Sequence, residues 1–193
     1  RSSIPRNGLT TSYVTAVGIG NQTDSVDGEP YSVTTTSMHW LSLIEVFSLS
    51  ARGAIVAFGD SITDGSCATL DGHNRWGDVL YTRLLDATGI ANLAMVNAGI
   101  GGNTVIRVPP VGSPPGVERM HRDVLSLAGV THVVLFLGTN DLRRDATADQ
   151  VISGLDDIVQ RAKARGLTVI GATIIARNPE PRGLPAGLGF GTT

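Results

Sequence analysis

A serine flanked by acidic residues directly follows a short apolar run in the first third of the chain. Residues 54–58 (A-I-V-A-F) suit a strand buried on both faces, and Gly59 ends the run. Ser61 comes next, between Asp60 and the pair Thr63–Asp64. A serine just past a buried strand lies at the carboxyl edge of the sheet, where open α/β sheets bind ligands. Such a hydroxyl could form covalent acyl intermediates. A G-D-S turn without a catalytic role is the alternative interpretation.

Two further polar loops follow predicted strands. Residues 93–96 form a short apolar run that leads into the loop 97–104, N-A-G-I-G-G-N-T. Residues 132–137 form the clearest strand in the sequence and lead into 138–141, G-T-N-D. If the strands are parallel, all three loops meet at the same edge of the sheet.

These blocks, G-D-S-I at 59–62, the glycine loop at 97–103 and G-T-N-D at 138–141, resemble the signature blocks of the SGNH (GDSL-type) hydrolases. They occur in the family's order, and the resemblance covers residues 54–174. It implies a serine esterase that forms an acyl-enzyme on Ser61. The sequence around residues 40–41 and 75–78 (R-W-G-D) is also similar to members that act on acylated carbohydrates, so short acyl esters such as acetyl esters are the expected substrates. Thr63 replaces the second glycine of the G-x-S-x-G elbow, which excludes the α/β-hydrolase motif.

The resemblance also assigns an oxyanion site. Hydrolysis of an ester passes through a tetrahedral oxyanion that needs hydrogen-bond donors fixed in advance. The backbone N–H groups of Ser61 and Gly102 and the side-chain amide of Asn140 would supply three donors. A glycine at 102 lets the backbone approach the substrate closely, and the amide of Asn140 donates while it stays neutral. Asp60 and Asp141 are expected to brace their own loops.

Strand and helix patterns alternate from residue 54 onward. Strands are predicted at 54–58, 93–96, 132–137 and 167–174, and helices at 74–84, 117–127 and 147–162. Thr147 and Gln150 form a capping box for the last helix. This alternation predicts an α/β fold with three layers, a mostly parallel sheet flanked by helices (SGNH/flavodoxin-like). Residues 51–193 are expected to form this hydrolase domain.

The first fifty residues have a different pattern. Residues 10–17 and 31–36 are rich in β-branched side chains and predict half-exposed strands. The apolar run 41–49 predicts a further strand that leads into the main sheet. We therefore interpret residues 1–50 as a small N-terminal β appendage, or as the remnant of a β domain.

Composition excludes several partners and cofactors. The chain has 193 residues and a net charge of −2, so no nucleic-acid or membrane partner is expected, and no segment is apolar enough to span a bilayer. Thr104 replaces the third glycine of a dinucleotide-binding motif. The single cysteine, Cys67, is expected to be buried. The four histidines have no metal-site spacing, so no metal and no cofactor are expected. A small-molecule or carbohydrate ester is the expected partner; compartment and oligomeric state stay undetermined.

The sequence departs from the family pattern in one respect. The family's general base is a histidine in a late D-x-x-H block, and no histidine follows His132. Both ends look cut, so we expect a chain truncated before that block and inactive as a catalyst. His73 could approach Ser61, although a solvated loop histidine is the simpler interpretation. There are two alternatives: a non-catalytic carbohydrate- or ester-binding protein, and a fragment without independent function.

Overall fold

A four-stranded parallel sheet forms the centre of the molecule. The computed structural model describes residues 8–38, 43–87, 92–110 and 112–174. The strand order is β4-β3-β5-β6, and every neighbouring pair is parallel. The strands are β3 (Gly53–Gly59), β4 (Leu93–Gly99), β5 (Val130–Phe136) and β6 (Thr168–Gly171). The predicted parallel α/β fold is therefore confirmed.

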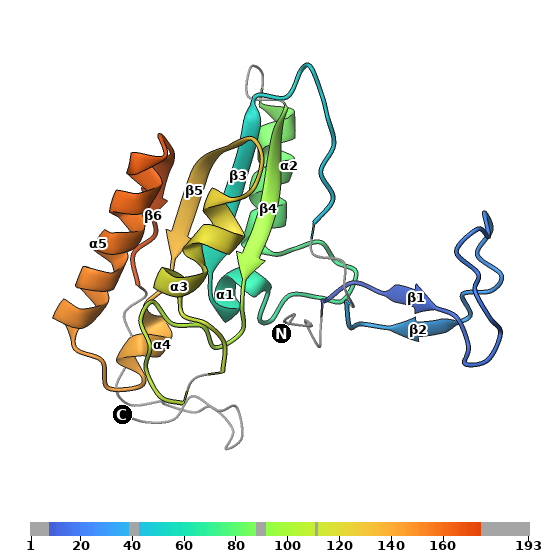
Figure 1. The fold of residues 1–193 in the computed structure, drawn as a ribbon, viewed down its shortest axis with the longest axis horizontal. Coiled ribbons are helices and arrows are strands. Elements are labelled where there is room, and N and C mark those ends of the chain that lie inside the picture. Colours follow the sequence, from blue (N-terminus) through green and yellow to red (C-terminus); the bar gives the residue numbers. More distant parts are fainter. Residues whose placement is uncertain (1–7, 39–42, 88–91, 111, 175–193) are drawn as a thin grey trace.

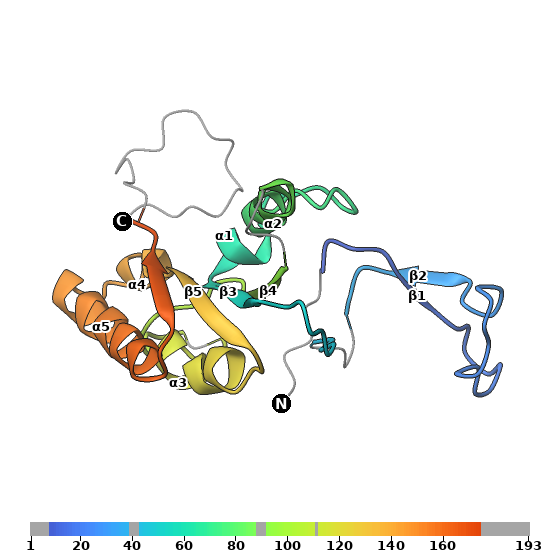
Figure 2. The same cartoon turned by 90° about the horizontal axis from the view of Figure 1, so that it is seen from above.

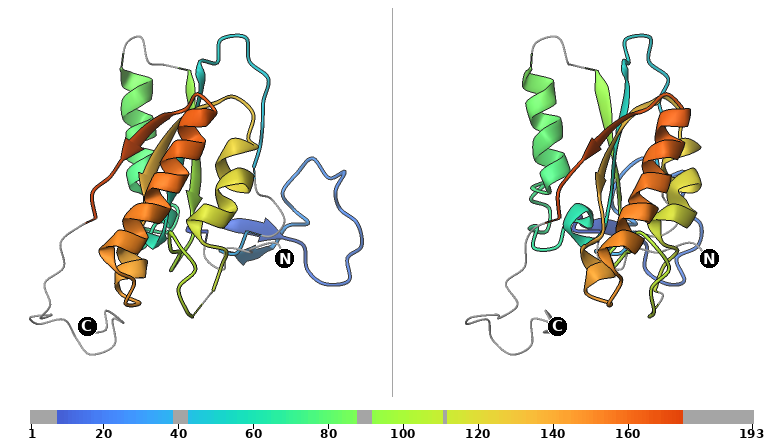
Figure 3. Two further views of the ribbon diagram at one scale, coloured as in Figure 1. Left: turned by 60° about the vertical axis from the view of Figure 1, so that its left-hand side comes forward. Right: turned by 90° about the vertical axis from the view of Figure 1, so that its left-hand side faces the viewer.

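Helices cover both faces of this sheet. They are α1 (Ser61–Asp64), α2 (Trp76–Asp86), α3 (Gly116–Met120), the π-helix η1 (His121–Leu125), α4 (Thr139–Leu142) and α5 (Ala148–Ala164). Figures 2 and 3 show α1 and α2 on one side of the sheet, and α3 and α5 on the other. The predicted capping box is present, because the Thr147 N–H donates to Gln150 at 2.9 Å and the Gln150 N–H donates to Thr147 at 3.3 Å. This box fixes the start of α5.

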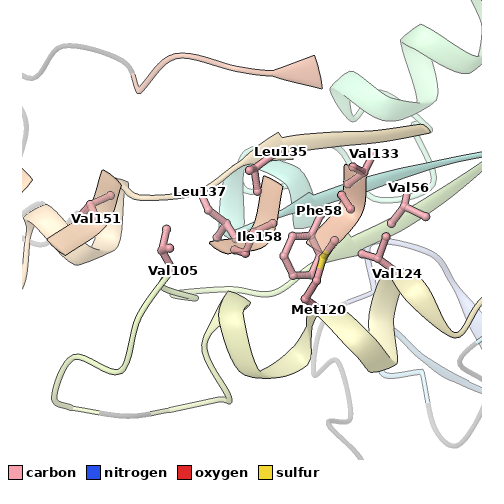
Figure 4. Close-up of a cluster of buried hydrophobic side chains, with 11 residues drawn as sticks. Val56, Phe58, Val105, Met120, Val124, Val133, Leu135, Leu137, Val151 and Ile158 are labelled. Carbon is pink, nitrogen blue, oxygen red and sulfur yellow. The ribbon is translucent and has the colours of Figure 1, made fainter. Parts of the chain in front are cut away.

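The main core lies between the sheet and the helices α3, η1 and α5 (Figure 4). Val56 and Phe58 of β3 point into it and are fully buried, as are Met120 and Ile158 from the helices. Ala57 points to the opposite face and is also fully buried. Because helices lie over both faces of β3, its sequence is a continuous apolar run rather than an alternating one.

The N-terminal residues form a small antiparallel sheet that stands away from the main body in Figure 1. Its strands, β1 (Ser12–Val14) and β2 (Val33–Thr35), are shorter than predicted. The strand predicted at 41–49 is wrong for the described residues 43–49, which form no strand. Both edges of β3 are occupied by β4 and β5, so the run finds no partner there, and Phe47 is 92% exposed.

Two other expectations need correction. Cys67 is exposed, with φ at +70°, because it lies in the turn that follows α1 rather than under a helix. The helix expected to start after Asn74 begins at Trp76, and Arg75 is its N-cap residue. The Asn74 side chain instead accepts a hydrogen bond from the Thr69 N–H at 2.9 Å, which closes the loop before the helix.

Candidate active site

The first of the three loops, which carries Ser61, begins where β3 ends. Asp60 is the N-cap of α1, and its carboxylate accepts a hydrogen bond from the Ile62 N–H at 2.9 Å. Ser61 is therefore the first residue of this short helix, and it is half-buried. Asp60 braces the serine turn through this hydrogen bond, as the sequence indicated, because an aspartate at an N-cap satisfies a backbone donor that the helix leaves free.

Close packing holds α1 against the end of the sheet. A Cβ on Gly59 would lie 2.0 Å from the Thr63 hydroxyl oxygen, so only glycine allows the helix to turn back over the strand. The Asn97 amide donates to the Thr63 carbonyl at 2.8 Å, and the Trp76 indole donates to the Thr63 hydroxyl at 3.3 Å. These contacts from β4 and α2 fix the orientation of the helix that carries Ser61.

The second loop follows β4 and contains Gly102. Its first residue, Ile100, donates its N–H to the Gly59 carbonyl at 3.2 Å, which joins this loop to the end of β3. Gly102 has φ at +70°, a backbone conformation that favours glycine. The Arg144 guanidinium donates to the Gly102 carbonyl at 3.1 Å. The position of Gly102 is thus determined by contacts with the first and third loops.

The third loop and α4 carry Asn140. The Asn140 side chain is buried, and its amide nitrogen donates to the Asn103 carbonyl at 2.9 Å and to the Asp60 carboxylate at 3.4 Å. The first contact has ordinary hydrogen-bond length, whereas the second is long and weak. One amide hydrogen is therefore held firmly, and the other is held only weakly.

Asp141 braces the second loop more than its own. Its fully buried carboxylate accepts hydrogen bonds from the Val105 N–H at 2.9 Å and from the Ile106 N–H at 3.0 Å. Burial raises the pKa of Asp141 above the usual carboxyl value, while these backbone hydrogen bonds and the charge of Arg144 oppose the shift. Asp141 was expected to brace its own loop. Its main hydrogen-bond donors instead belong to the neighbouring loop, so the prediction was wrong about the main partners of this carboxylate.

The structure therefore brings the three predicted site residues to one edge of the sheet. Ser61, Gly102 and Asn140 follow the carboxyl ends of β3, β4 and β5, and these are three neighbouring parallel strands. Main-chain and side-chain hydrogen bonds join the three loops to one another. This is the arrangement that an oxyanion site needs, because its donors must be held in place before charge develops.

The described histidines have other surroundings. His132 pairs with Ile55 in the first half of β3, away from the carboxyl edge, and its ring bonds with the Thr131 hydroxyl at 2.8 Å. His121 is exposed at the start of η1. His73 is exposed in a loop that Asp71 ties to the N-terminal segment through the Thr11 N–H at 2.6 Å. None of these three donates to or accepts from Ser61, and His39 lies outside the described residues.

Sequence reasoning missed two buried residues near the site. Asn103 directly follows Gly102, and Arg119 lies in α3 with only 2% of its surface exposed. Arg119 and Asp123 lie four residues apart, and this pair of opposite charges next to the apolar Met120 and Val124 was a signal that could have drawn attention to Arg119. Asp64 also contacts the second loop: burial raises the pKa of this carboxyl, while Arg75 and the Gly101 N–H oppose the shift.

The described part of the chain offers no group of three or more His, Cys, Asp or Glu side chains that could hold a metal ion. Within the same ranges no helix is both long and apolar enough to cross a bilayer.

Comparisons with known proteins identify the family of the chain and proteins of similar fold. Residues 57–189, more than half of the chain, match the GDSL-like Lipase/Acylhydrolase family. The solved structure of AlinE4, an SGNH-hydrolase family esterase, has 26% sequence identity and a TM-score of 0.52, and the match covers 64% of this chain and 60% of AlinE4. TesA has 29% identity and a TM-score of 0.52, with 63% of this chain and 60% of TesA covered.

A third structure shows the fold alone. The psychrotrophic esterase EstA from Pseudoalteromonas sp. has 22% identity and a TM-score of 0.52, over 67% of this chain and 64% of EstA. The chain thus spans about 60% of the length of AlinE4 and TesA. The comparison with curated protein sequences gave no match. From the family match and the three joined loops, we conclude that the chain belongs to the GDSL-like lipase/acylhydrolase family, the SGNH hydrolases.

Proposed function

We propose that this protein is a serine ester hydrolase in which Ser61 is the nucleophile. The observation that carries the proposal is the junction at the carboxyl edge of the sheet, where Asn140 bonds both to Asn103 beside Gly102 and to Asp60 beside Ser61. The amide of Asn140, the Gly102 N–H and the Ser61 N–H are then the donors that stabilise the oxyanion.

The reaction has two acyl-transfer steps. The Ser61 oxygen attacks the ester carbonyl carbon, its proton passes to a general base, and the carbonyl oxygen takes the negative charge. The tetrahedral intermediate collapses with loss of the alcohol, which takes up the proton, and the acyl group stays on Ser61. Water then attacks the acyl-enzyme and gives a proton to the base. The second tetrahedral intermediate collapses to the carboxylic acid, and the base returns the proton to the Ser61 oxygen.

The substrate class is the less direct part of the proposal. We propose short acyl esters, with acetyl groups on carbohydrate as the candidate natural substrate. The resemblance of residues 75–78 to members that act on acylated carbohydrates supports it. In the structure this segment opens α2, where Arg75 donates to the Asp64 carbonyl at 2.8 Å, so it also stabilises the helix that carries Ser61.

The positions of the described histidines favour a second candidate function. His73, His121 and His132 do not bond to Ser61, and a serine hydroxyl without a base is a poor nucleophile. We therefore expect weak turnover of activated esters and none of acetylated sugars by the 193-residue chain. A protein that keeps the pocket and binds the ester without cleaving it is the alternative function.

Hydrolysis of 4-nitrophenyl acetate by the purified chain and its variants distinguishes the two. We expect Ser61→Ala to abolish the enzymatic rate, and Asn140→Ala to lower kcat by roughly 10²–10³, the scale for one oxyanion donor. Ser66→Ala is the matched control, because Ser66 is a nearby exposed serine that contacts Ser61 only through its backbone N–H. It should leave the rate unchanged.

The remaining outcomes are also decisive. If Ser61→Ala retains the rate of the unaltered chain, Ser61 is not the nucleophile. If the unaltered chain shows no rate above the Ser61→Ala background but binds an acetylated sugar, the binding function holds instead. If His73→Ala removes a robust rate, His73 is the base and the expectation of weak turnover is wrong.

A further inference from the structure

Arg119 lies beneath the candidate active site and contacts two of its three loops. Its side chain has no exposed surface, and it extends from α3 toward the carboxyl ends of β3 and β4. Burying a guanidinium group is unfavourable unless it is paired and hydrogen-bonded. Its partners therefore indicate what the group does in this position.

Each nitrogen of the Arg119 guanidinium donates to a different acceptor near the site. Nη2 donates to the Gly59 carbonyl at 2.8 Å, and Nη1 donates to the Ala98 carbonyl at 2.8 Å. Nε donates to the Asn103 side-chain oxygen at 2.9 Å. Gly59 lies two residues before Ser61, and Asn103 directly follows Gly102. One rigid fork thus holds the strand ends from which both backbone oxyanion donors extend.

Two further contacts hold the fork itself. Asp123 accepts a hydrogen bond from Nη1 at 2.9 Å, and the guanidinium carbon lies 4.0 Å from the centre of the Phe58 ring. The ring packs against the plane of the guanidinium, and the carboxylate balances its charge. A guanidinium is planar with five donors in fixed directions, so a lysine ammonium cannot reproduce this set.

The network continues to the third loop. Asn103 uses its side-chain oxygen for Arg119, its amide for Ser113 at 2.8 Å and its main-chain carbonyl for Asn140 at 2.9 Å. The position of the Asn140 amide therefore depends on Asn103, which Arg119 holds. All three proposed oxyanion donors are linked to this one buried cation.

We propose that Arg119 is a positioning residue that sets the spacing of the oxyanion donors at Ser61, Gly102 and Asn140. It acts through the Gly59 and Ala98 carbonyls and the Asn103 side chain and does not touch the substrate. A misplacement of reacting groups by about 1 Å can lower a rate by roughly 10². The rate measurement described next rests on the proposed function, because it requires Ser61 to be the nucleophile.

Arg119→Lys is the test variant, and Arg161→Lys is its matched control. Arg161 also reaches α3, where it donates to the Val117 carbonyl at 2.6 Å and to Asp157 at 3.1 Å, but it contacts none of the three loops. The first measurement is the second-order rate at which an alkyl fluorophosphonate modifies Ser61. We expect Arg119→Lys to slow it by roughly 10² and Arg161→Lys by less than about twofold.

The second measurement does not depend on catalysis. The backbone amide resonances of Ser61 and Gly102 in ¹⁵N-labelled protein should shift in Arg119→Lys and keep their positions in Arg161→Lys. Asn103→Ala removes the Nε acceptor, together with the amide that donates to Ser113 and to the Pro114 carbonyl, and it keeps the other partners of Arg119. It should shift the same amides and slow the modification by about tenfold. It is the second variant if Arg119→Lys does not fold.

The outcomes separate this inference from the proposed function. Equal effects of Arg119→Lys and Arg161→Lys on the amides would overturn the positioning role, as would unshifted Ser61 and Gly102 amides in Asn103→Ala. If the fluorophosphonate does not modify Ser61 in the unaltered chain, the proposed function fails, and the amide shifts alone then decide the role of Arg119.

Discussion

The carboxyl edge of the main sheet and the N-terminal segment, residues 8–50, break the usual rule of burial in opposite ways. At the edge, polar and charged side chains are buried: Asp60, Asn103, Arg119, Asn140 and Asp141 are each no more than 6% exposed. In the N-terminal segment, apolar side chains are exposed, and Val17 and Val26 are fully open to solvent.

The difference lies in the partners that each region has. Among the described residues no buried side-chain nitrogen or oxygen lacks a hydrogen-bond partner, so the polar edge is a satisfied network. Such a network fixes positions, because every group in it has a set direction. The exposed valines of the N-terminal segment have no comparable constraints. We therefore expect substitutions at the edge to be costly and those in the N-terminal segment to have little effect.

Asp141→Ala should give the largest loss of stability. The substitution leaves the buried N–H of Val105 and the partly buried N–H of Ile106 without their acceptor. We expect the free energy of unfolding to fall by about 3 kcal/mol, as measured by urea denaturation. Asp141→Asn keeps one acceptor oxygen and should lose less. If Asp141→Ala were as stable as the unaltered chain, the edge would not be the tightly held network described above.

Asp123→Asn should have an intermediate, pH-dependent effect. Burial alone would raise the pKa of Asp123, but hydrogen bonds from Arg122 and Arg119 outweigh it and hold the pKa of this carboxyl below its usual value. The charged form is thus favoured on folding. We expect the substitution to lower the free energy of unfolding by about 2 kcal/mol at neutral pH, because it leaves the buried Arg119 without its counter-charge.

The contribution of Asp123 to the free energy of unfolding depends on pH, and its lowered pKa determines the direction of that dependence. A carboxyl whose folded pKa is lowered stabilises the protein above its unfolded pKa and loses that contribution as the pH falls through the folded value. The difference between Asp123→Asn and the unaltered chain should stay constant from about pH 7 to pH 5 and shrink below about pH 4. Urea denaturation at these pH values measures it. A difference that grew as the pH fell would contradict the pairing.

Val17→Ser and Val26→Ser should have the smallest effects. Both side chains are fully exposed, so we expect the free energy of unfolding to change by no more than about 0.5 kcal/mol. Val133→Ala, at a fully buried position in β5, is the contrasting variant and should cost about 2 kcal/mol. A large loss of stability from Val17→Ser would contradict the full exposure of this side chain.

The sequence was informative where local pattern and tertiary burial agree. The continuous apolar run at 54–58 predicted a strand with both faces covered, and the Thr147–Gln150 capping box predicted the start of α5. The apolar run at 41–49 has the composition of a strand, but a strand also needs a partner strand, and the described residues 43–49 pair with none. Sequence composition carries no information about pairing. The pattern alone therefore failed there.

The candidate site shows the same division. Ser61, Gly102 and Asn140 could be located because each follows a predicted strand in a recognisable block. The partners of Arg119 could not be predicted, since it reaches Gly59 and Ala98 from a helix distant along the chain, and only the packing of α3 against the strand ends brings them together. The partner of Asp141 was missed for this reason too.

The crystal structure of the chain after reaction with a small alkyl fluorophosphonate tests the central claim most directly. The phosphonyl oxygen of the adduct occupies the place of the oxyanion. We predict a covalent bond from phosphorus to the Ser61 oxygen, with the phosphonyl oxygen about 2.7–3.1 Å from the Ser61 N–H nitrogen, the Gly102 N–H nitrogen and the Asn140 amide nitrogen. An adduct on another residue, or a phosphonyl oxygen that points away from Gly102 and Asn140, would contradict the proposed site.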